Sequence, residues 1–299
     1  MLFYYTTKGQ GFMNDYIIFT DSACDLSVDY MNENNIGFCS LTFMFEGDGT
    51  VYQNYDLSAD EFYQKMKDGL IVRTSAVNSD TYKIAFKNEL KKGNDILYLG
   101  FSSGLSSTYE HAVIAAEELK KDYPNNKIIT VDTLSASAGL ALLINLAMKK
   151  KNEGRSIDEV ADFVVENRLN VCHWYTVDSL MYLKRGGRVN PAVAIIGEAL
   201  GIKPIMHMDN DGKLTKVSTA RGKKAATEAI LKKYEELRLT DEYPVYISQG
   251  DAKEDAERLK QIFCDRYGVE VELIAPVGPV IGAHSGPGTY SIFFLGKER

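Results

Sequence analysis

The chain has 299 residues, a length that allows a sizeable buried core and two domains of ordinary size, although one large domain also fits it. Its 34 lysines and arginines against 41 aspartates and glutamates give a formal net charge of -7. Such a charge repels the phosphates of nucleic acids and of anionic membranes, so we expect no nucleic-acid partner.

The cysteines and the lack of long apolar runs indicate in which cellular compartment the protein resides. The four cysteines, Cys24, Cys39, Cys172 and Cys264, form no C-x-x-C pair, and no histidine stands at metal-ligand spacing from them. We therefore expect reduced thiols, no metal site and no cofactor. No segment resembles a signal peptide or reaches the roughly 18 apolar residues of a membrane helix, which predicts a cytoplasmic protein without stable membrane insertion.

In chain order, residues 1–12 lack periodicity and are expected to form an N-terminal extension. From residue 13, short apolar runs ending in Ser, Thr or Asp alternate with amphipathic runs of helical period, the pattern of βα units. Predicted strands cover 16–20, 37–45 with a short return strand after the turn at 48–49, 72–74, 95–101 and 127–132. One helix is predicted to start at residue 27, another to cover 79–92, and two more to end near residues 121 and 149. Two further helices are predicted to begin at capping boxes, one from 58–61 to 69 and the other from 156–159 to 168.

Beyond residue 168 the pattern becomes mixed, and we place a domain boundary there. The second half predicts a hairpin over 204–220, helices over 223–237 and 252–267, and strands over 243–248, 269–275 and 292–295. The predicted fold is α/β with two domains. The N-terminal domain, 13–168, has a mainly parallel sheet flanked by helices, and the C-terminal domain, 169–299, is mixed α/β.

Four predicted strand ends carry loops rich in hydroxyl side chains, namely 20–25, 73–79, 102–108 and 132–137. In an open α/β sheet, ligands bind beyond the carboxyl ends of the strands, and helix N-termini favour anions. Helix capping explains any single loop of this kind, but four that converge indicate a site. No Walker loop or G-x-G-x-x-G turn follows any strand, so a small anion such as a carboxylate fits better than a polyphosphate.

An enzymatic alternative comes from the segment 100–104, which matches the G-x-S-x-G nucleophile elbow between a strand and a helix. Ser102, or Ser106 in the same loop, would be the nucleophile, and His284 would be the base. No HGGG-like oxyanion segment precedes the match, and no aspartate can be assigned as the third triad member. A serine hydrolase stays open as an alternative, as does a binding module for another small acid.

Two further segments stand out in the second half. His284 lies within 282–288 among three glycines and a proline, which allow close backbone packing, although a surface turn is the plainer interpretation. The segment 182–188 combines three cations with two glycines, as a helix end or an anion contact would, ahead of an apolar helix predicted over 189–200. Several apolar residues there either pack in the core or line a narrow tunnel, and they are Val193, Ile195, Ile196, Leu200, Ile202 and Ile205.

Six segments in order resemble the motifs of the DegV family of fatty-acid-binding proteins. Each match is weak by itself, but together they run from about residue 15 to the C-terminus. The segments are Thr20-Asp-Ser-Ala-Cys-Asp-Leu26, Arg73-Thr-Ser75, Ser102-Ser-Gly-Leu-Ser-Ser-Thr-Tyr109, Tyr182-Leu-Lys-Arg-Gly-Gly-Arg188, Lys203-Pro-Ile205 and His284-Ser-Gly-Pro-Gly288.

The resemblance implies a protein that is not an enzyme and that holds a long-chain fatty acid, such as palmitate, stearate or oleate, in a tunnel near the junction of two α/β domains. It also implies that the protein presents the carboxyl group to a fatty acid kinase, which forms the acyl phosphate used in lipid metabolism. Because a kinase must reach the head group, we expect His284 to be partly accessible. The family's motifs place the carboxylate at Thr74, Ser106 and His284, with secondary contacts from Ser75, Ser103 and Arg188.

The chain departs from the family pattern at a few positions. Ala76-Val77 stands where the family commonly has Gln-Pro, and Ser107 replaces a usual glycine. Neither change touches the three head-group residues. The basic face for docking the kinase corresponds to Arg221, within 220–224.

Overall fold

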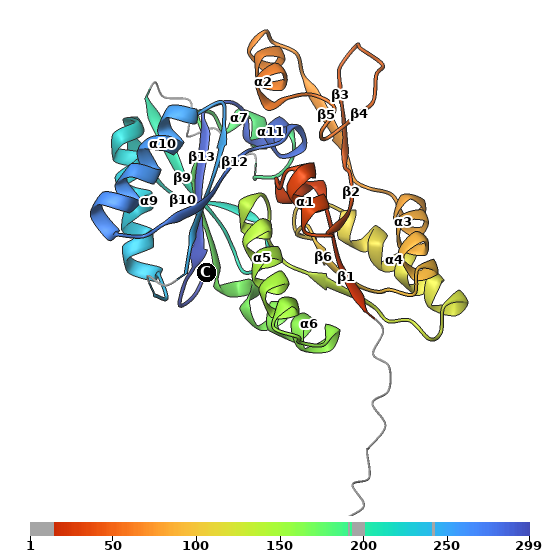
Figure 1. Ribbon diagram of the computed structural model, residues 1–299. Helices are drawn as coiled ribbons and strands as arrows, with labels where there is room; N and C mark the ends of the chain where they lie inside the picture. The colour runs from red at the N-terminus through yellow and green to blue at the C-terminus, as the bar shows by residue number, and fades with distance from the viewer. Residues whose placement is uncertain (1–14, 191, 193–200, 241–242) are drawn as a thin grey trace, which may run out of the picture.

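The computed structural model describes residues 15–190, 192, 201–240 and 243–299, and its α/β architecture is built on three sheets (Figure 1). The predicted extension 1–12 lies outside these residues, as does most of the predicted apolar helix 189–200. No helix in the described part of the chain is long and apolar enough to cross a lipid bilayer.

The first sheet is parallel and comes from the first half of the chain. Its strands, in spatial order, are β2 (Gly37–Cys39), β1 (Tyr16–Asp21), β6 (Asp95–Gly100) and β7 (Ile128–Asp132). β1 and β6 are buried along their whole length, as expected for parallel strands covered on both faces. Around this sheet lie the short turn η1 (Ser22–Cys24) and the helices α1 (Val28–Glu33), α3 (Ser79–Lys91), α4 (Thr108–Asp122), α5 (Ala138–Asn152) and α6 (Ile157–Asn167).

The predicted single strand over 37–45 is wrong, because the chain changes sheets within it. After β2, the backbone N–H of Leu41 donates to Ser22 Oγ at 2.9 Å instead of continuing the ladder. The chain then enters a small antiparallel sheet of β4 (Tyr52–Gln53), β3 (Thr42–Phe45) and β5 (Val72–Ser75). The helix α2 (Ala59–Lys67) covers it, and the predicted capping box of Ser58 with Glu61 is confirmed.

The second large sheet comes from the second half and is mixed. Its order is β10 (Leu214–Arg221), β9 (Ile202–Met208), β8 (Val171–Thr176), β13 (Thr289–Leu295), β11 (Val245–Gly250) and β12 (Val271–Pro276), and β11 with β12 is its parallel pair. The predicted hairpin is confirmed as β9 and β10, whereas β8 is a buried strand for which the prediction gave only a strand-like run around His173, without bounds. The other elements of this half are η2 (Arg168–Asn170), α7 (Met181–Arg185), α9 (Gly222–Leu237), α10 (Lys253–Ile262), the π-helical turn η4 (Phe263–Tyr267) and α11 (Pro279–Ser285).

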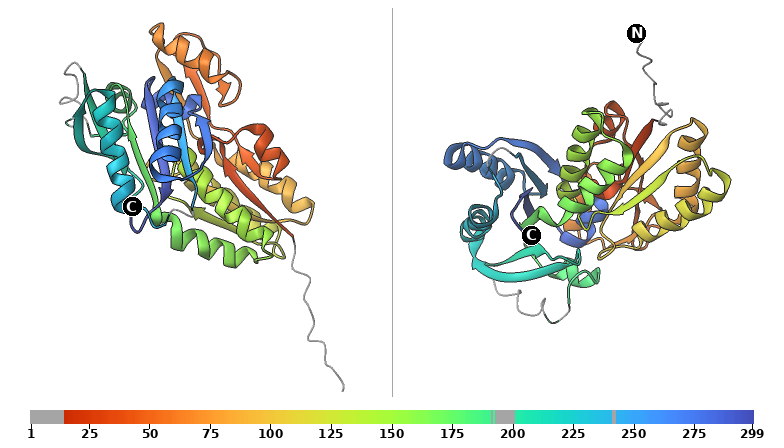
Figure 2. Two further views of the ribbon diagram at one scale, coloured as in Figure 1. Left: turned by 60° about the vertical axis from the view of Figure 1, so that its left-hand side comes forward. Right: turned by 90° about the horizontal axis from the view of Figure 1, so that it is seen from below.

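Helix α5 lies between the two large sheets, which Figures 1 and 2 show in green between the blue and red parts of the molecule. Its side chains Leu140, Leu142, Leu143 and Ile144 are at most 1 % exposed, so the first two turns of the helix are buried on every side. It packs on η1 and on β8, β11 and β13. A helical segment that is apolar all round belongs in a core, and here one core joins both sheets. The predicted α/β fold class is therefore confirmed.

Helix α11 crosses from the second half onto the first, where it packs on α2, β3 and β5. The first backbone N–H groups of a helix lack partners within the helix. Here Asp25 Oδ1 accepts from the N–H of Gly278 and Asn54 Oδ1 accepts from the N–H of Val280, each at 2.9 Å. A side chain at Gly278 would lie 2.7 Å from Asn54 Nδ2, so glycine is needed for this approach. The domain boundary at residue 168 stays a prediction.

Asp25 is a buried carboxyl group that holds this junction together. Besides accepting from Gly278, it accepts from the Ser137 hydroxyl at 2.5 Å, and it is 7 % exposed. Burial raises the pKa of Asp25 from 3.8 to about 7, against the opposing effect of these two hydrogen bonds. Because the folded state binds this proton more tightly than the unfolded state, the stabilisation is fully present below about pH 4 and is lost as the pH rises through 7.

The variant Asp25→Asn should flatten the dependence of stability on pH. The asparagine side chain stays neutral, can still accept from Gly278 and can donate to Ser137 Oγ. We expect its free energy of unfolding to exceed that of the wild type at pH 8 and to match it only near pH 4, as measured by urea unfolding of the ligand-free protein. Exposed Asp162→Asn on α6 serves as the control. Parallel pH profiles for Asp25→Asn and the wild type would contradict this explanation.

Candidate ligand-binding site

A cavity of about 210 Å³ opens between the carboxyl ends of the first sheet, α11 and the inner face of the second sheet. Much of its lining is apolar. Among the described residues, Arg188 is the one lining residue with a permanent charge, and no acidic side chain lines the cavity. The apolar lining residues include Leu41, Phe101, Leu105, Leu183, Met208, Leu214, Val277, Val280, Ile281 and Phe293.

Thr74 and His284, which lie 210 positions apart in the sequence, meet at the cavity wall. Thr74 Oγ1 on β5 is 2.8 Å from His284 Nε2 in the last turn of α11, and both side chains are half-buried. The partial accessibility expected of His284 is therefore present. Burial, aided by the positive charge of Arg188, lowers the pKa of His284 to about 4, so the imidazole is neutral at pH 7.

The glycines near His284 do allow close packing, but the surface-turn interpretation is wrong because His284 lies in the last turn of the helix α11. A Cβ at Gly186 would lie 2.0 Å from His284 Nδ1, so only glycine lets the end of α7 approach the ring. Beyond the helix, Gly286 and Gly288 have φ of 76° and 81° and fit against Tyr182 and Asp178. Gly186 therefore makes room for the ring, and the two later glycines let the chain turn after the helix.

Ser106 and Arg188 line the cavity together with Thr74. Ser106 Oγ lies 2.9 Å from Thr108 Oγ1 and accepts from the backbone N–H of Thr108 at 3.2 Å, which fixes it at the start of α4. The Arg188 guanidinium donates to the carbonyls of Leu105, at 3.1 Å, and Gly186. No carboxylate within the described residues pairs with it, so its charge is uncompensated inside the cavity.

Of the two remaining predicted contacts, Ser75 and Ser103, only one lies at the cavity. Ser75 lines the cavity, next to Thr74 on β5. Ser103 is not among the lining residues, and its backbone N–H donates to Asp132 Oδ1 at 3.3 Å. The predicted loops therefore converge, but only some of their hydroxyl groups reach the cavity.

The G-x-S-x-G segment serves the packing of its loop. Ser102 is fully buried outside the cavity lining, and its hydroxyl donates to the carbonyl of Gly212 at 2.8 Å. Gly104 fits against the same turn, where a Cβ would lie 2.6 Å from the carbonyl oxygen of Asp211. In the described structure Ser102 therefore has its own partner and does not contact His284. The Nδ1 atom of His284 is buried without a hydrogen-bond partner, so no acid orients the ring as in a triad.

Sequence reasoning missed the cavity residues that come from the second sheet. Tyr175, Ser248 and Ser291 all line the cavity, on β8, β11 and β13. The signal was present in β13, where Thr289 and Ser291 alternate with larger apolar and aromatic side chains. Because the prediction gave β8 no bounds, nothing indicated which face of that sheet lines the cavity.

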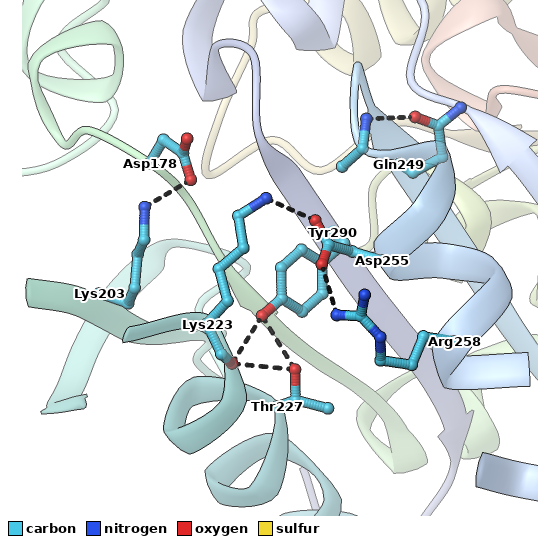
Figure 3. A network of polar contacts seen from close by, with 9 residues as sticks. Asp178, Lys203, Lys223, Thr227, Gln249, Asp255, Arg258 and Tyr290 are labelled. Atoms are coloured by element: carbon cyan, nitrogen blue, oxygen red, sulfur yellow. Dashed lines mark hydrogen bonds and ion pairs between the residues drawn. The ribbon is translucent and has the colours of Figure 1, made fainter. Parts of the chain in front are cut away.

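Arg221 lies away from the cavity, exposed at the end of β10. Two of the cations near it are paired, Lys203 with Asp178 and Lys223 with Asp255, both at 2.6 Å (Figure 3). Arg221 has no ion pair with any residue in the described ranges. It therefore presents an uncompensated positive charge on the surface.

Comparison with known proteins agrees with this geometry. A family model described as "Uncharacterised protein, DegV family" matches residues 16–297. A DegV domain-containing protein of Clostridium perfringens is 40 % identical over 291 residues, which cover 96 % of this chain and 99 % of that protein.

Solved structures are similar over nearly the whole chain. A stearic-acid-binding protein from Eubacterium ventriosum has a TM-score of 0.86 at 25 % identity and covers 94 % of this chain and 98 % of its own. A DegV family protein from Thermus thermophilus, described by its fatty acid binding, has a TM-score of 0.84 at 27 % identity and covers 94 % and 99 %. With the family model matching almost its full length, this chain belongs to the DegV family.

Proposed function

We propose that the cavity binds a long-chain fatty acid, such as palmitate, stearate or oleate, with its carboxylate at Thr74, Ser106 and His284. The observation that carries the proposal is the contact between Thr74 and His284 beside the unpaired Arg188, at the wall of a largely apolar cavity. One guanidinium and a few neutral donors suit a single negative charge. Relatives with similar folds that are described as binding fatty acids support the same ligand class.

The neutral imidazole gives each head-group residue a role. If Nε2 carries the proton, it donates to Thr74 Oγ1, and the single hydroxyl proton of Thr74 is then free to donate to the ligand. His284 thus orients Thr74, while Ser106 supplies a second hydroxyl. Arg188, which lines the same cavity, adds a positive charge near these donors. The carboxylate thereby gains directed hydrogen-bond donors.

The tail supplies most of the affinity in this arrangement. Burying a methylene group contributes about 0.8 kcal/mol, so a chain of C16 to C18 contributes more than roughly ten kcal/mol before the costs of ordering. The head group then fixes the register of the chain in the cavity.

Native mass spectrometry of the purified protein tests the proposal. After mild extraction, we expect a bound mass in the range of C14 to C18 fatty acids, released on denaturation. An empty protein that hydrolyses p-nitrophenyl esters, and that loses this activity in Ser102→Ala, would instead establish the hydrolase. An empty protein that also fails to take up added palmitate, stearate and oleate would contradict fatty acid binding.

Removing the head-group hydroxyls should weaken binding. We expect Thr74→Val and Ser106→Ala each to reduce the affinity for stearate by roughly 1 to 3 kcal/mol, because the ligand carboxylate loses a buried donor. Ser103→Ala is the matched control, since Ser103 shares a loop with Ser106 but does not line the cavity. Titration calorimetry of the delipidated protein measures all three. Equal losses in Ser103→Ala and Ser106→Ala would show that the carboxylate lies elsewhere.

The protein would present the bound carboxylate to a fatty acid kinase for acyl-phosphate formation, without transforming it itself. The half-buried positions of Thr74, Ser106 and His284 support this, because a second protein can reach a head group held there. Arg221 offers an unpaired charge for an acidic surface on that kinase. A rim charge of this kind mainly steers association.

Reversing that charge should separate docking from lipid binding. We expect Arg221→Glu to lower the rate of acyl-phosphate formation by a fatty acid kinase roughly tenfold at low salt, with stearate affinity unchanged. Exposed Lys260→Glu on α10 is the matched control for net charge. If both variants slow the kinase equally, the effect is one of overall charge, and Arg221 is not a docking residue.

A further inference from the structure

A row of polar side chains crosses the sheet wall of the cavity. Tyr175 on β8 lies directly opposite Ser291 on β13, and Ser291 lies directly opposite Ser248 on β11. All three line the cavity and are at most 8 % exposed. Side chains directly opposite each other in antiparallel strands share one face of the sheet, so the three form a continuous row.

The row lies between the head-group end and a deeper part of the cavity. Two residues before Ser291 is Thr289, whose hydroxyl donates to the carbonyls of Ser285 and Gly286 at the end of α11. Two residues after it is Phe293, opposite His173. Rows on one face of a strand are roughly 7 Å apart. A chain that runs down the sheet from α11 therefore passes this row part-way along its length.

The Tyr175 hydroxyl is buried without a hydrogen-bond partner. Burial also raises the pKa of Tyr175, so the phenol keeps its proton and can both donate and accept. Buried polar groups are nearly always paired, and an unpaired one costs stability. A purely hydrocarbon chain would cover this hydroxyl and leave it unpaired.

Ser248 offers a matching donor. Ser137 Oγ lies 2.5 Å from Asp25 Oδ2 and 3.1 Å from Ser248 Oγ. Ser137 is the donor in both contacts, so its one proton is shared between Asp25 and Ser248, and Ser248 keeps its own hydroxyl proton. The Ser248 hydroxyl can therefore donate into the cavity. The row thus combines a donor at Ser248 with an acceptor at Tyr175, which is the pattern that complements another hydroxyl group.

We infer that this row is a subsite for a hydroxyl group carried part-way along an acyl chain, so that the cavity accepts hydroxylated long-chain fatty acids. The inference rests on the proposed function, since it assumes that an acyl chain enters the cavity. A hydroxyl in a purely apolar cavity loses its hydration without compensation. Here the row would replace that hydration, and only for a hydroxyl at the matching distance from the carboxylate.

Binding of stearic, 10-hydroxystearic and 12-hydroxystearic acids to the delipidated full chain tests the subsite. We expect one hydroxylated isomer to bind the wild type at least as tightly as stearate, and the other more weakly. Tyr175→Phe should weaken the favoured isomer roughly tenfold relative to stearate, the ratio expected for one lost hydrogen bond. Ser291→Ala is a second variant for the same row. Tyr290→Phe is the control, because its hydroxyl contacts Thr227 on the opposite face of the sheet (Figure 3).

The outcomes separate the subsite from the proposed function. If stearate binds the wild type but every hydroxylated isomer binds more than tenfold weaker, the row holds solvent only and the subsite is refuted. An isomer ratio that is the same in the wild type, Tyr175→Phe and Ser291→Ala would refute it as well. If neither stearate nor any isomer binds the wild type, the fatty acid function itself fails and the subsite fails with it.

Discussion

The site depends on how α11 is seated. This short helix belongs to the second half of the chain, yet its first N–H groups are bound by Asp25 and Asn54 from the first half. Helix N-termini need such partners, and here they come from across the junction. Once α11 is held there, His284 in its last turn meets Thr74 on β5. Neither half of the chain contains the proposed head-group site alone.

The chemistry of the site follows from what surrounds that junction. Burial keeps His284 neutral, and glycine at 186 leaves room for its ring. Arg188 brings one charge without a carboxylate beside it among the described residues. The result is a set of oriented donors near a single cation, which suits the binding of a carboxylate better than nucleophilic attack, because Ser102 is committed to the hairpin turn at Gly212.

Much of the first half could be predicted from the sequence, because its signals are local. The capping boxes at Ser58 and Ser156 and the fully apolar runs of β1 and β6 act within a few residues. The motifs also brought Thr74 and His284 together, although no local pattern links them. The break between β2 and β3 depends on the hydroxyl of Ser22, 19 residues away, and so could not be predicted from either strand. The polar row was missed for the same reason, since it exists only in the register of three strands.

Burial of α5 between the two sheets has a consequence for the life of the protein in the cell. The sheets share one core, so the halves cannot part without exposing the first turns of a helix that are apolar on every side. A lipid in the cavity would touch both halves and add its binding free energy to that shared core by mass action. On the proposed function, depletion of fatty acids would raise the share of empty carrier. The empty form would open more often and be degraded sooner, so the level of the carrier would follow the supply of its cargo.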